Sequence, residues 1–205
     1  MNNNKTIRNI RSRMVPLPLE NVDTDQIIPS RFLKATTRTG FKEGLFHDWR
    51  YDHHDRLQPD FVLNNPSYAG NILVAGKNFG CGSSREHAAW AIKDYGFDVV
   101  ISSAFADIFR NNALNNFLLP VTVSELFLQK LFTAAGKDPR TLLEINLEQQ
   151  SVILLSTGRK ETFDIDPYKK NCLLNGLDDI DFLLNLKPEI ELFENSSNHL
   201  KEKTT

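Results

Sequence analysis

Cysteine is scarce in this chain of 205 residues, which contains only Cys81 and Cys172. Two thiols cannot form the disulfide framework that stabilises many small secreted domains. They are also too few to ligate an iron–sulfur cluster, which is usually held by several cysteine thiolates. The sequence therefore predicts a cytoplasmic protein with reduced thiols that holds no such cluster by itself.

Long hydrophobic runs and an excess of one charge are also missing. No apolar stretch approaches the roughly 18 residues needed to span a bilayer. Segment 1–13 is polar and basic with no apolar stretch behind it, so we expect no secretory leader. The 24 basic and 26 acidic residues give a formal net charge of −2. This balance favours neither nucleic acid nor an anionic membrane as a partner.

The length and the hydrophobic content of the chain indicate one domain. Hydrophobic residues make up 40% of the chain, enough for a core. We predict a single domain over 1–205, with polar, frayed ends at about 1–10 and 195–205. Segment 15–33 mixes prolines with short apolar pairs, which indicates extended chain and turns rather than helix. Segment 35–65 is irregular and indicates a long loop.

Regular structure is predicted from residue 71 onward. Apolar runs indicate buried strands, and they alternate with segments of helical periodicity. The strands are 71–75, 98–102 and 119–123, and the helices are 84–95, 105–117 and 124–135. This alternation predicts a parallel sheet with crossover helices. Later strands at 142–147, 151–155 and 162–165, and a helix at 166–175, predict an antiparallel addition, so the fold class is mixed α/β.

The segment 76–90, GKNFGCGSSREHAAW, carries the most chemical information. Gly76, Gly80 and Gly82 lie in a turn between a strand and a helix, where glycine permits positive φ and the close approach of a ligand. The helix that follows directs its free N–H groups and the positive end of its dipole at the turn. Arg85 adds a guanidinium that suits a carboxylate or phosphate. Together these features predict a site for an anion.

A purely structural interpretation of the same residues carries about equal weight. Ser83 and Glu86 fit a capping box, in which Ser83 only caps the helix and Arg85 lies in solvent. The segment does not match the phosphate loop GxxxxGK[ST], and Arg85 stands where GxGxxG requires its last glycine. It also differs from the nucleophile elbow G-x-S-x-G, although composition does not exclude a Ser–His–Asp hydrolase.

Ordered segments of the chain resemble the aconitase superfamily. GSSREHAAWA, from Gly82, is similar to the signature G-S-S-R-E-H-A of the superfamily's swivelling domain, and SAFADIFRNNALNNFLLP at 103–120 is similar to a second segment of that domain. NVDTDQIIPSRFLK at 21–34 and GFKEGLFHDWRY at 40–51 resemble the free-standing small subunits of isopropylmalate dehydratases. The matches span about 22–121, and their common order makes the signal specific.

The resemblance implies a mixed β/β/α swivelling domain and a role for several residues. Ser83, the first serine of the signature, would be the base that exchanges a proton with a substrate carbon. Ser84 and Arg85 would bind a substrate carboxylate. Asp25 matches a family aspartate near the site, and Arg31 is a further candidate for binding, although its spacing from Asp25 is shorter than in single-chain aconitases. An adjacent arginine and a helix N-terminus would stabilise the alkoxide that a serine base requires.

Gly80, Cys81, Gly82 and His87 complete the predicted site loop. Aconitases often have an acidic residue before GSSRE, whereas this chain has Cys81-Gly82. Cys81 is either a contact on the substrate side or a small filler, and we favour the filler. His87, one turn along the helix from Ser83, either orients the serine loop or is a structural residue that makes one hydrogen bond.

The implied function is one half of a hydro-lyase that interconverts 2-isopropylmalate and 3-isopropylmalate in leucine biosynthesis. A large subunit would bring a 4Fe–4S cluster, whose exposed iron acts as a Lewis acid on the hydroxy-diacid substrate. We expect no cofactor and no metal in this chain, because His47, His53 and His54 lie in a charged loop without regular ligand spacing. The alternatives are a related hydratase acting on homoaconitate or a methylmalate, and a non-catalytic module that binds an anion.

The irregular stretch 35–56 is predicted to be a mobile lid. It carries several aromatic residues, and such a loop has to dock on something. Leu45 and Phe46 are predicted to contact the substrate's alkyl group and to help select isopropyl over methyl or carboxyethyl groups. The alternative is that these side chains dock on the large subunit and only hold the complex together.

Overall fold

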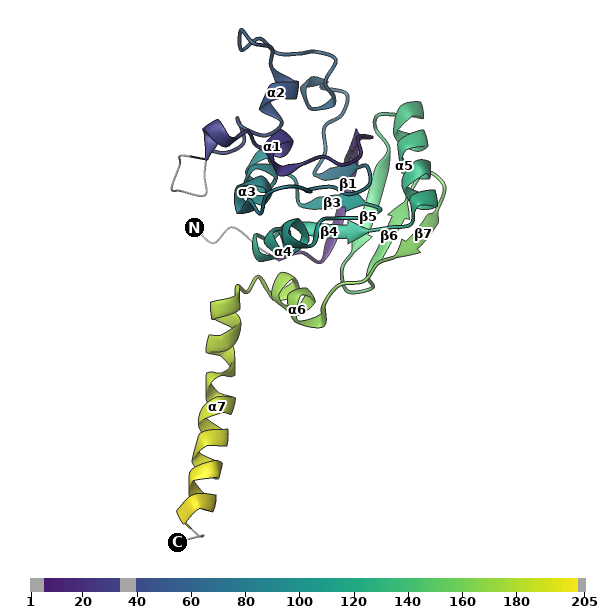
Figure 1. Cartoon of the computed structure of the whole chain (residues 1–205). Coiled ribbons are helices and arrows are strands. Elements are labelled where there is room, and N and C mark those ends of the chain that lie inside the picture. The colour runs from purple at the N-terminus through teal and green to yellow at the C-terminus, as the bar shows by residue number, and fades with distance from the viewer. Residues whose placement is uncertain (1–5, 34–39, 203–205) are drawn as a thin grey trace.

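A computed structural model describes residues 6–33 and 40–202, with side chains up to residue 194. These residues form a seven-stranded sheet in the order β4-β3-β2-β1-β5-β6-β7 (Figure 1). The parallel strands are β1 (Asn9–Leu17), β2 (Ile72–Ala75), β3 (Val99–Ser102) and β4 (Leu119–Thr122). The antiparallel strands are β5 (Leu142–Asn146), β6 (Ser151–Leu154) and β7 (Arg159–Thr162). The predicted mixed α/β fold, with a parallel core and an antiparallel addition, is confirmed.

Helices cover both faces of the sheet. The crossover helices are α3 (Glu86–Tyr95), α4 (Asp107–Asn115) and α5 (Glu125–Lys137), close to their predicted positions. The shorter elements are α1 (Thr24–Ile27), η1 (Ser30–Phe32), α2 (His47–Arg50), η2 (Val62–Asn64) and α6 (Pro167–Asn175). A long helix, α7 (Asp179–Glu202), ends the described chain.

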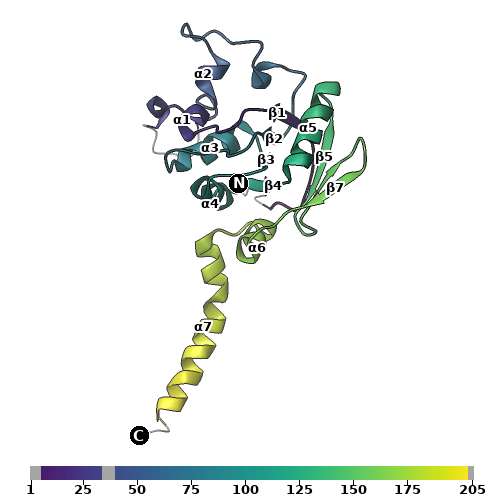
Figure 2. The same cartoon turned by 45° about the vertical axis from the view of Figure 1, so that its right-hand side comes forward.

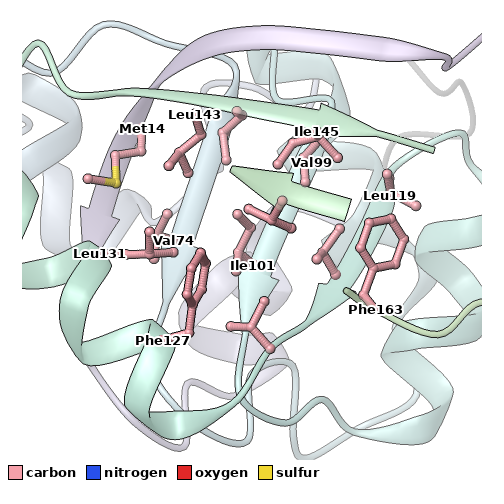
Figure 3. Packing of buried hydrophobic residues seen from close by; sticks show 14 of the residues in the cluster. Met14, Val74, Val99, Ile101, Leu119, Phe127, Leu131, Leu143, Ile145 and Phe163 are labelled. Atoms are coloured by element: carbon pink, nitrogen blue, oxygen red, sulfur yellow. The ribbon is translucent and has the colours of Figure 1, made fainter. Parts of the chain in front are cut away.

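The two faces of β2 explain its unbroken apolar sequence. Ile72 and Val74 belong to a cluster that includes Phe127 of α5 (Figure 3). Leu73 and Ala75 belong to the other cluster, with the buried residues of α3 and with Phe109 and Ala113 of α4. Since successive side chains of a strand point to opposite faces, a strand covered on both sides is apolar throughout.

β1 joins the two halves of the sheet and was not predicted as a strand. Its first half pairs antiparallel with β5 as far as Arg13, and its second half pairs parallel with β2 from Met14 onward. Pro16 lies opposite Val74 in the second half, where pairing with β5 has ended and the strand has an unpaired side.

The prediction of no helix in 15–33 is wrong for the second half of this segment. Asp23 caps α1 by accepting from the N–H of Gln26, and the Gln26 side chain accepts from the N–H of Asp23. This reciprocal arrangement is a capping box with aspartate and glutamine in place of serine and glutamate. The short helices α1 and η1 follow it.

The last strand and the start of the chain also differ from the prediction. β7 lies at Arg159–Thr162 rather than at 162–165, because the hairpin turn reaches only to Gly158. Ile7 is buried, and its N–H donates to the carbonyl of Leu173 at 2.9 Å, so the chain is ordered well before residue 10. α7 extends to Glu202, and fraying of the tail at 195–205 stays a prediction. Among the described residues, no helix is long and apolar enough to cross a membrane.

Candidate active site

The glycine-rich segment forms a loop between β2 and α3, as predicted, and it is fixed from two sides. On one side, the N–H of Thr24 donates to the carbonyl of Cys81 at 2.9 Å. On the other side, Phe79 exchanges two backbone hydrogen bonds of 3.1 Å with segment 104–106. The position of the loop therefore depends on parts of the chain that are distant in sequence.

Two glycines give this loop its shape. Gly80 and Gly82 have φ values of +77° and +85°, in the region that glycine adopts without strain. A Cβ atom on Gly80 would also overlap the ring of Phe109, with the ring Cδ2 only 2.7 Å away. The prediction of positive φ in this turn is confirmed for Gly80 and Gly82.

The serines of the loop are presented to solvent and do not cap the helix. α3 begins at Glu86, and its N-cap is Arg85, which makes no side-chain cap hydrogen bond. Ser83 and Ser84 are exposed, and within the described residues neither hydroxyl makes a hydrogen bond. The carbonyl of Ser83 accepts from Thr24 Oγ1 at 2.9 Å. The capping-box interpretation of Ser83 is therefore wrong, and its backbone rather than its hydroxyl holds the loop in place.

Arg85 pairs with Asp25, which lies 60 residues earlier in the chain. Its Nη1 donates to a carboxylate oxygen of Asp25. The Arg85 side chain is only 20% exposed, so the interpretation that it lies in solvent is wrong. Asp25 is the only hydrogen-bond partner of this guanidinium among the described residues, which leaves Nε and Nη2 as donors for a ligand carboxylate.

Arg31 is engaged elsewhere. Its guanidinium pairs with Asp48, lies 3.0 Å from Nδ1 of His47 and stacks over the ring of Phe32 at 5.0 Å. This guanidinium holds the pKa of the Asp48 carboxyl below its usual value through a hydrogen bond. No contact joins Arg31 to Arg85 within the described residues. A substrate contact by Arg31 stays a prediction.

Cys81 and His87 both make structural contacts. The thiol of Cys81 donates to the carbonyl of Asn21 at 3.3 Å, which tightens the connection between the loop and segment 21–24. The ring of His87 packs against Trp90 and Phe41, with centroid distances of 4.6 and 5.5 Å. These contacts favour a structural role for both side chains.

The prediction that Leu45 and Phe46 form a substrate-selecting lid is wrong. Both side chains are 0% exposed and belong to the same core cluster as the helices of the site. They cannot contact a substrate or dock on another chain from this position. Residues 34–39, which include the start of the predicted lid, lie outside the described residues.

Two polar residues that were not predicted fix the backbone of this segment. The carboxylate of Asp94, on α3, accepts from the N–H groups of Gly40, Phe41 and Lys42 at 2.9–3.0 Å. Arg50 is buried and donates to two backbone carbonyls of the same segment at 3.1 and 3.3 Å. The Asp94 contact has no local signature, because Asp94 lies more than 50 residues from its partners.

Glu86, the acidic residue of the signature, was predicted only as part of a cap. Its Oε1 accepts from Nδ2 of Asn116 at 2.8 Å and from Nε1 of Trp90 at 3.2 Å. Asn116 follows α4, so Glu86 fixes the start of α3 against the end of the neighbouring helix. The sequence matches S-x-x-E, but the Glu86 side chain bonds to Trp90 and Asn116 and does not complete a cap with Ser83.

The chain offers no site for an iron–sulfur cluster in the part that the structure describes. Cys81 lies in the site loop, whereas Cys172 is buried in α6, where burial raises the pKa of its thiol. No group of three histidine, cysteine or acidic side chains could hold a metal ion among the described residues. His53 and His54 stack on each other with ring centroids 3.9 Å apart.

Comparison with known proteins matches this geometry to a family. Residues 4–126 match the model of the aconitase C-terminal domain, which covers more than half of the chain. The chain therefore belongs to the aconitase C-terminal domain family.

The close relatives within this family share one description. The chain is 59% identical over 191 residues to the 3-isopropylmalate dehydratase small subunit of Cytophaga hutchinsonii, covering 93% of this chain and 95% of the relative. It is 60% identical to that of Azobacteroides pseudotrichonymphae, covering 90% and 94%. The crystal structure of 3-isopropylmalate dehydratase from Methanocaldococcus jannaschii superposes with a TM-score of 0.63 at 26% identity, covering 92% of this chain and 99% of that one.

Proposed function

We propose that the chain is the small subunit of a 3-isopropylmalate dehydratase, a hydro-lyase of leucine biosynthesis. The sequence identity of about 60% over nearly the whole of the relatives supports this proposal. The structural observation that carries it is the exposed Ser83 beside the Arg85–Asp25 pair. That arrangement combines a hydroxyl for proton transfer with a guanidinium for a carboxylate.

The chemistry of the substrate fits these groups. Removal of a proton next to a carboxylate requires a base at the carbon and a cation at the carboxylate. Arg85 can bind the carboxylate through Nε and Nη2, because Asp25 occupies only Nη1. Asp25 would hold the guanidinium in a fixed orientation while leaving its other edge open. Ser84, the exposed neighbour, would add a hydroxyl to the same carboxylate.

Ser83 would take the proton as an alkoxide, which needs electrostatic stabilisation near neutral pH. Arg85 is two residues away, and the N–H groups of Glu86 and His87 at the start of α3 donate to no protein acceptor within the described residues. These donors and the positive end of the helix dipole favour negative charge in front of the helix. These features would stabilise the ionised form of Ser83.

The cluster would have to come from another chain. The two thiols of this chain do not converge, so we infer that a large subunit carries the 4Fe–4S cluster and covers the face that exposes Ser83 and Ser84. A cytoplasmic location fits the two free thiols.

Reconstitution tests the proposed function. The purified chain is expected to show no hydratase activity and no iron alone, and to convert 2-isopropylmalate when mixed with the large subunit of the same organism. Activity and iron content are measured for each chain and for the mixture. Homoaconitate and a methylmalate serve as competing substrates, and a higher kcat/KM on either would reassign the substrate. A chain that binds anions but never supports turnover would favour the non-catalytic module instead.

Exchange of Arg85 for lysine is expected to lower kcat/KM by about 10–100-fold, mainly through KM. Lysine keeps the charge but loses the planar donor pair, and a charge-assisted hydrogen bond contributes about 1.5–3 kcal/mol. Steady-state kinetics of the reconstituted complex give the split between kcat and KM. Arg56→Lys is the control, because Arg56 is 71% exposed and pairs only with Asp52 among the described residues. Equal kinetics for both variants would show that Arg85 does not contact substrate.

A further inference from the structure

The loop at 77–85 lies along segment 21–25, which is distant from it in sequence. α1 begins within this segment and lies beside α3 in both views (Figures 1 and 2). The two stretches run parallel, as the bridge between Asp23 and Cys81 shows. Backbone hydrogen bonds of 2.8–2.9 Å join the pairs Asn21 with Lys77, Val22 with Gly80 and Thr24 with Cys81. The shape of the loop therefore depends on segment 21–25.

The side chain of Thr24 extends this support to the proposed base. Thr24 is only 1% exposed, and its Oγ1 donates to the carbonyl of Ser83 at 2.9 Å across a separation of 59 residues. Its N–H donates to the carbonyl of Cys81, so Thr24 binds the loop at two points. Gly82 lies between these points with a φ of +85°, and glycine leaves the backbone free to turn. The hydroxyl of Thr24 is therefore needed to define where Ser83 lies.

The next residue, Asp25, holds the other functional group of the site. Its carboxylate accepts from the guanidinium of Arg85. Thr24 thus fixes the residue proposed as the base, and Asp25 fixes the residue proposed to bind a carboxylate. Removal of the Thr24 hydroxyl leaves the pair between Asp25 and Arg85 in place, so the two contacts can be tested separately.

We infer that Thr24 is a positioning residue, whose hydroxyl places Ser83 for proton transfer. This inference rests on the proposed function, which makes Ser83 the base. Thr24 is buried beneath the loop and acts through the Ser83 carbonyl rather than on the substrate. A displacement of about 1 Å in a reacting group can lower a rate by about 100-fold. Loss of the hydroxyl therefore lowers kcat, whereas KM depends on Arg85 and changes little.

The test uses Thr24→Val in the full chain, reconstituted with the large subunit. Valine keeps the branched shape of the side chain and removes the hydroxyl. The kcat is expected to fall by about 10–100-fold. The KM should change by less than about threefold, because binding in the ground state is retained. Thr24→Ser keeps the hydroxyl and should keep kcat within about threefold of the wild type.

Thr141→Val is the matched control, because it removes another buried threonine hydroxyl away from the loop. Thr141 is 6% exposed, and its Oγ1 donates to the carbonyls of Ala134 and Asp138 at 3.1 and 2.6 Å. Both valine variants should lower the melting temperature by about 2–6 °C, as expected for the loss of a buried hydrogen bond. Only Thr24→Val should lower kcat.

Alkylation of Cys81 by iodoacetamide gives a second measurement that needs no turnover. The Cys81 thiol donates to the carbonyl of Asn21 at 3.3 Å, so its reactivity reports how closely the loop lies on segment 21–25. Cys172 is 5% exposed and serves as the internal reference. In the isolated chain, Thr24→Val should speed the labelling of Cys81 by about threefold or more, since it loosens the loop locally. Thr141→Val should leave this rate unchanged.

Three results would overturn the inference while the wild-type complex turns over and the proposed function stands. The first is a wild-type kcat, or an unchanged rate of Cys81 labelling, in Thr24→Val. The second is an equal loss of kcat in Thr24→Val and Thr141→Val, which points to general destabilisation. The third is a loss of kcat in Thr24→Ser as large as that in Thr24→Val, which assigns the effect to packing. A wild-type mixture without turnover would refute the proposed function and, with it, the role of Thr24 in catalysis.

Discussion

Replacement of Ser83 with alanine is expected to lower kcat of the reconstituted enzyme by about 10²–10⁴-fold or more, the usual contribution of a general base. The melting temperature of the chain should stay unchanged, because the hydroxyl makes no hydrogen bond within the described residues and the loop is held by the Ser83 carbonyl. A capping serine would instead lose about 0.5–2 kcal/mol of stability on the same change. Kinetics of the Ser83→Ala variant therefore test the catalytic role of Ser83, and its thermal unfolding tests the capping role.

Ser84→Ala is the matched neighbour for this experiment. Both serines are exposed and precede α3, but only Ser83 is proposed to accept the proton. Ser84→Ala should raise KM more than it lowers kcat, since it removes one hydroxyl from carboxylate binding. If Ser83→Ala keeps its kcat while Ser84→Ala loses it, the two roles are exchanged. If both variants turn over normally, the base lies on the large subunit.

The parts of the fold that could be predicted are those with local patterns. β2, β3 and β4 are apolar runs covered on both faces, and the helices between them have regular periodicity and clear ends, such as Gly96 with φ of +114°. β1 has no such pattern, because its pairing changes from β5 to β2 after Arg13. The half that ends at Arg13 is also only partly buried. Its existence depends on strands that come more than 50 residues later.

The site shows the same division between local and distant contacts. The glycine turn and the serines were recognisable in sequence, and the resemblance pointed to Asp25, but the Arg85–Asp25 pair is a tertiary contact. Leu45 and Phe46 were assigned to a lid because they lie in an irregular segment. Their burial depends on Asp94 and Arg50, whose partners are backbone groups that no side-chain pattern reveals.

Replacement of Gly80 with alanine is expected to have the largest effect on stability, about 2–5 kcal/mol. The left-handed backbone costs a non-glycine residue about 1–2 kcal/mol. The added methyl group overlaps the Phe109 ring, and overpacking of this kind costs about 1–3 kcal/mol more. Because Phe109 is 2% exposed and packed in the core, the loop rather than the ring is expected to move. Movement of the loop would displace Ser83 and lower activity even in the folded fraction.

Gly158→Ala separates the cost of the left-handed backbone from the cost of the overlap with Phe109. Gly158 has a φ of +67°, close to that of Gly80, but nothing lies within 4 Å of the position of its Cβ. This variant should lose only the unfolding free energy that the left-handed backbone costs a non-glycine residue. It should keep full activity, because Gly158 lies in the β6–β7 hairpin. The difference in unfolding free energy between the variants, measured by urea titration, gives the cost of the overlap with Phe109. Equal losses in the two variants would show that the Phe109 ring yields and that the loop stays in place. A larger loss in Gly80→Ala together with normal turnover would show that the placement of Ser83 tolerates a shift in the loop.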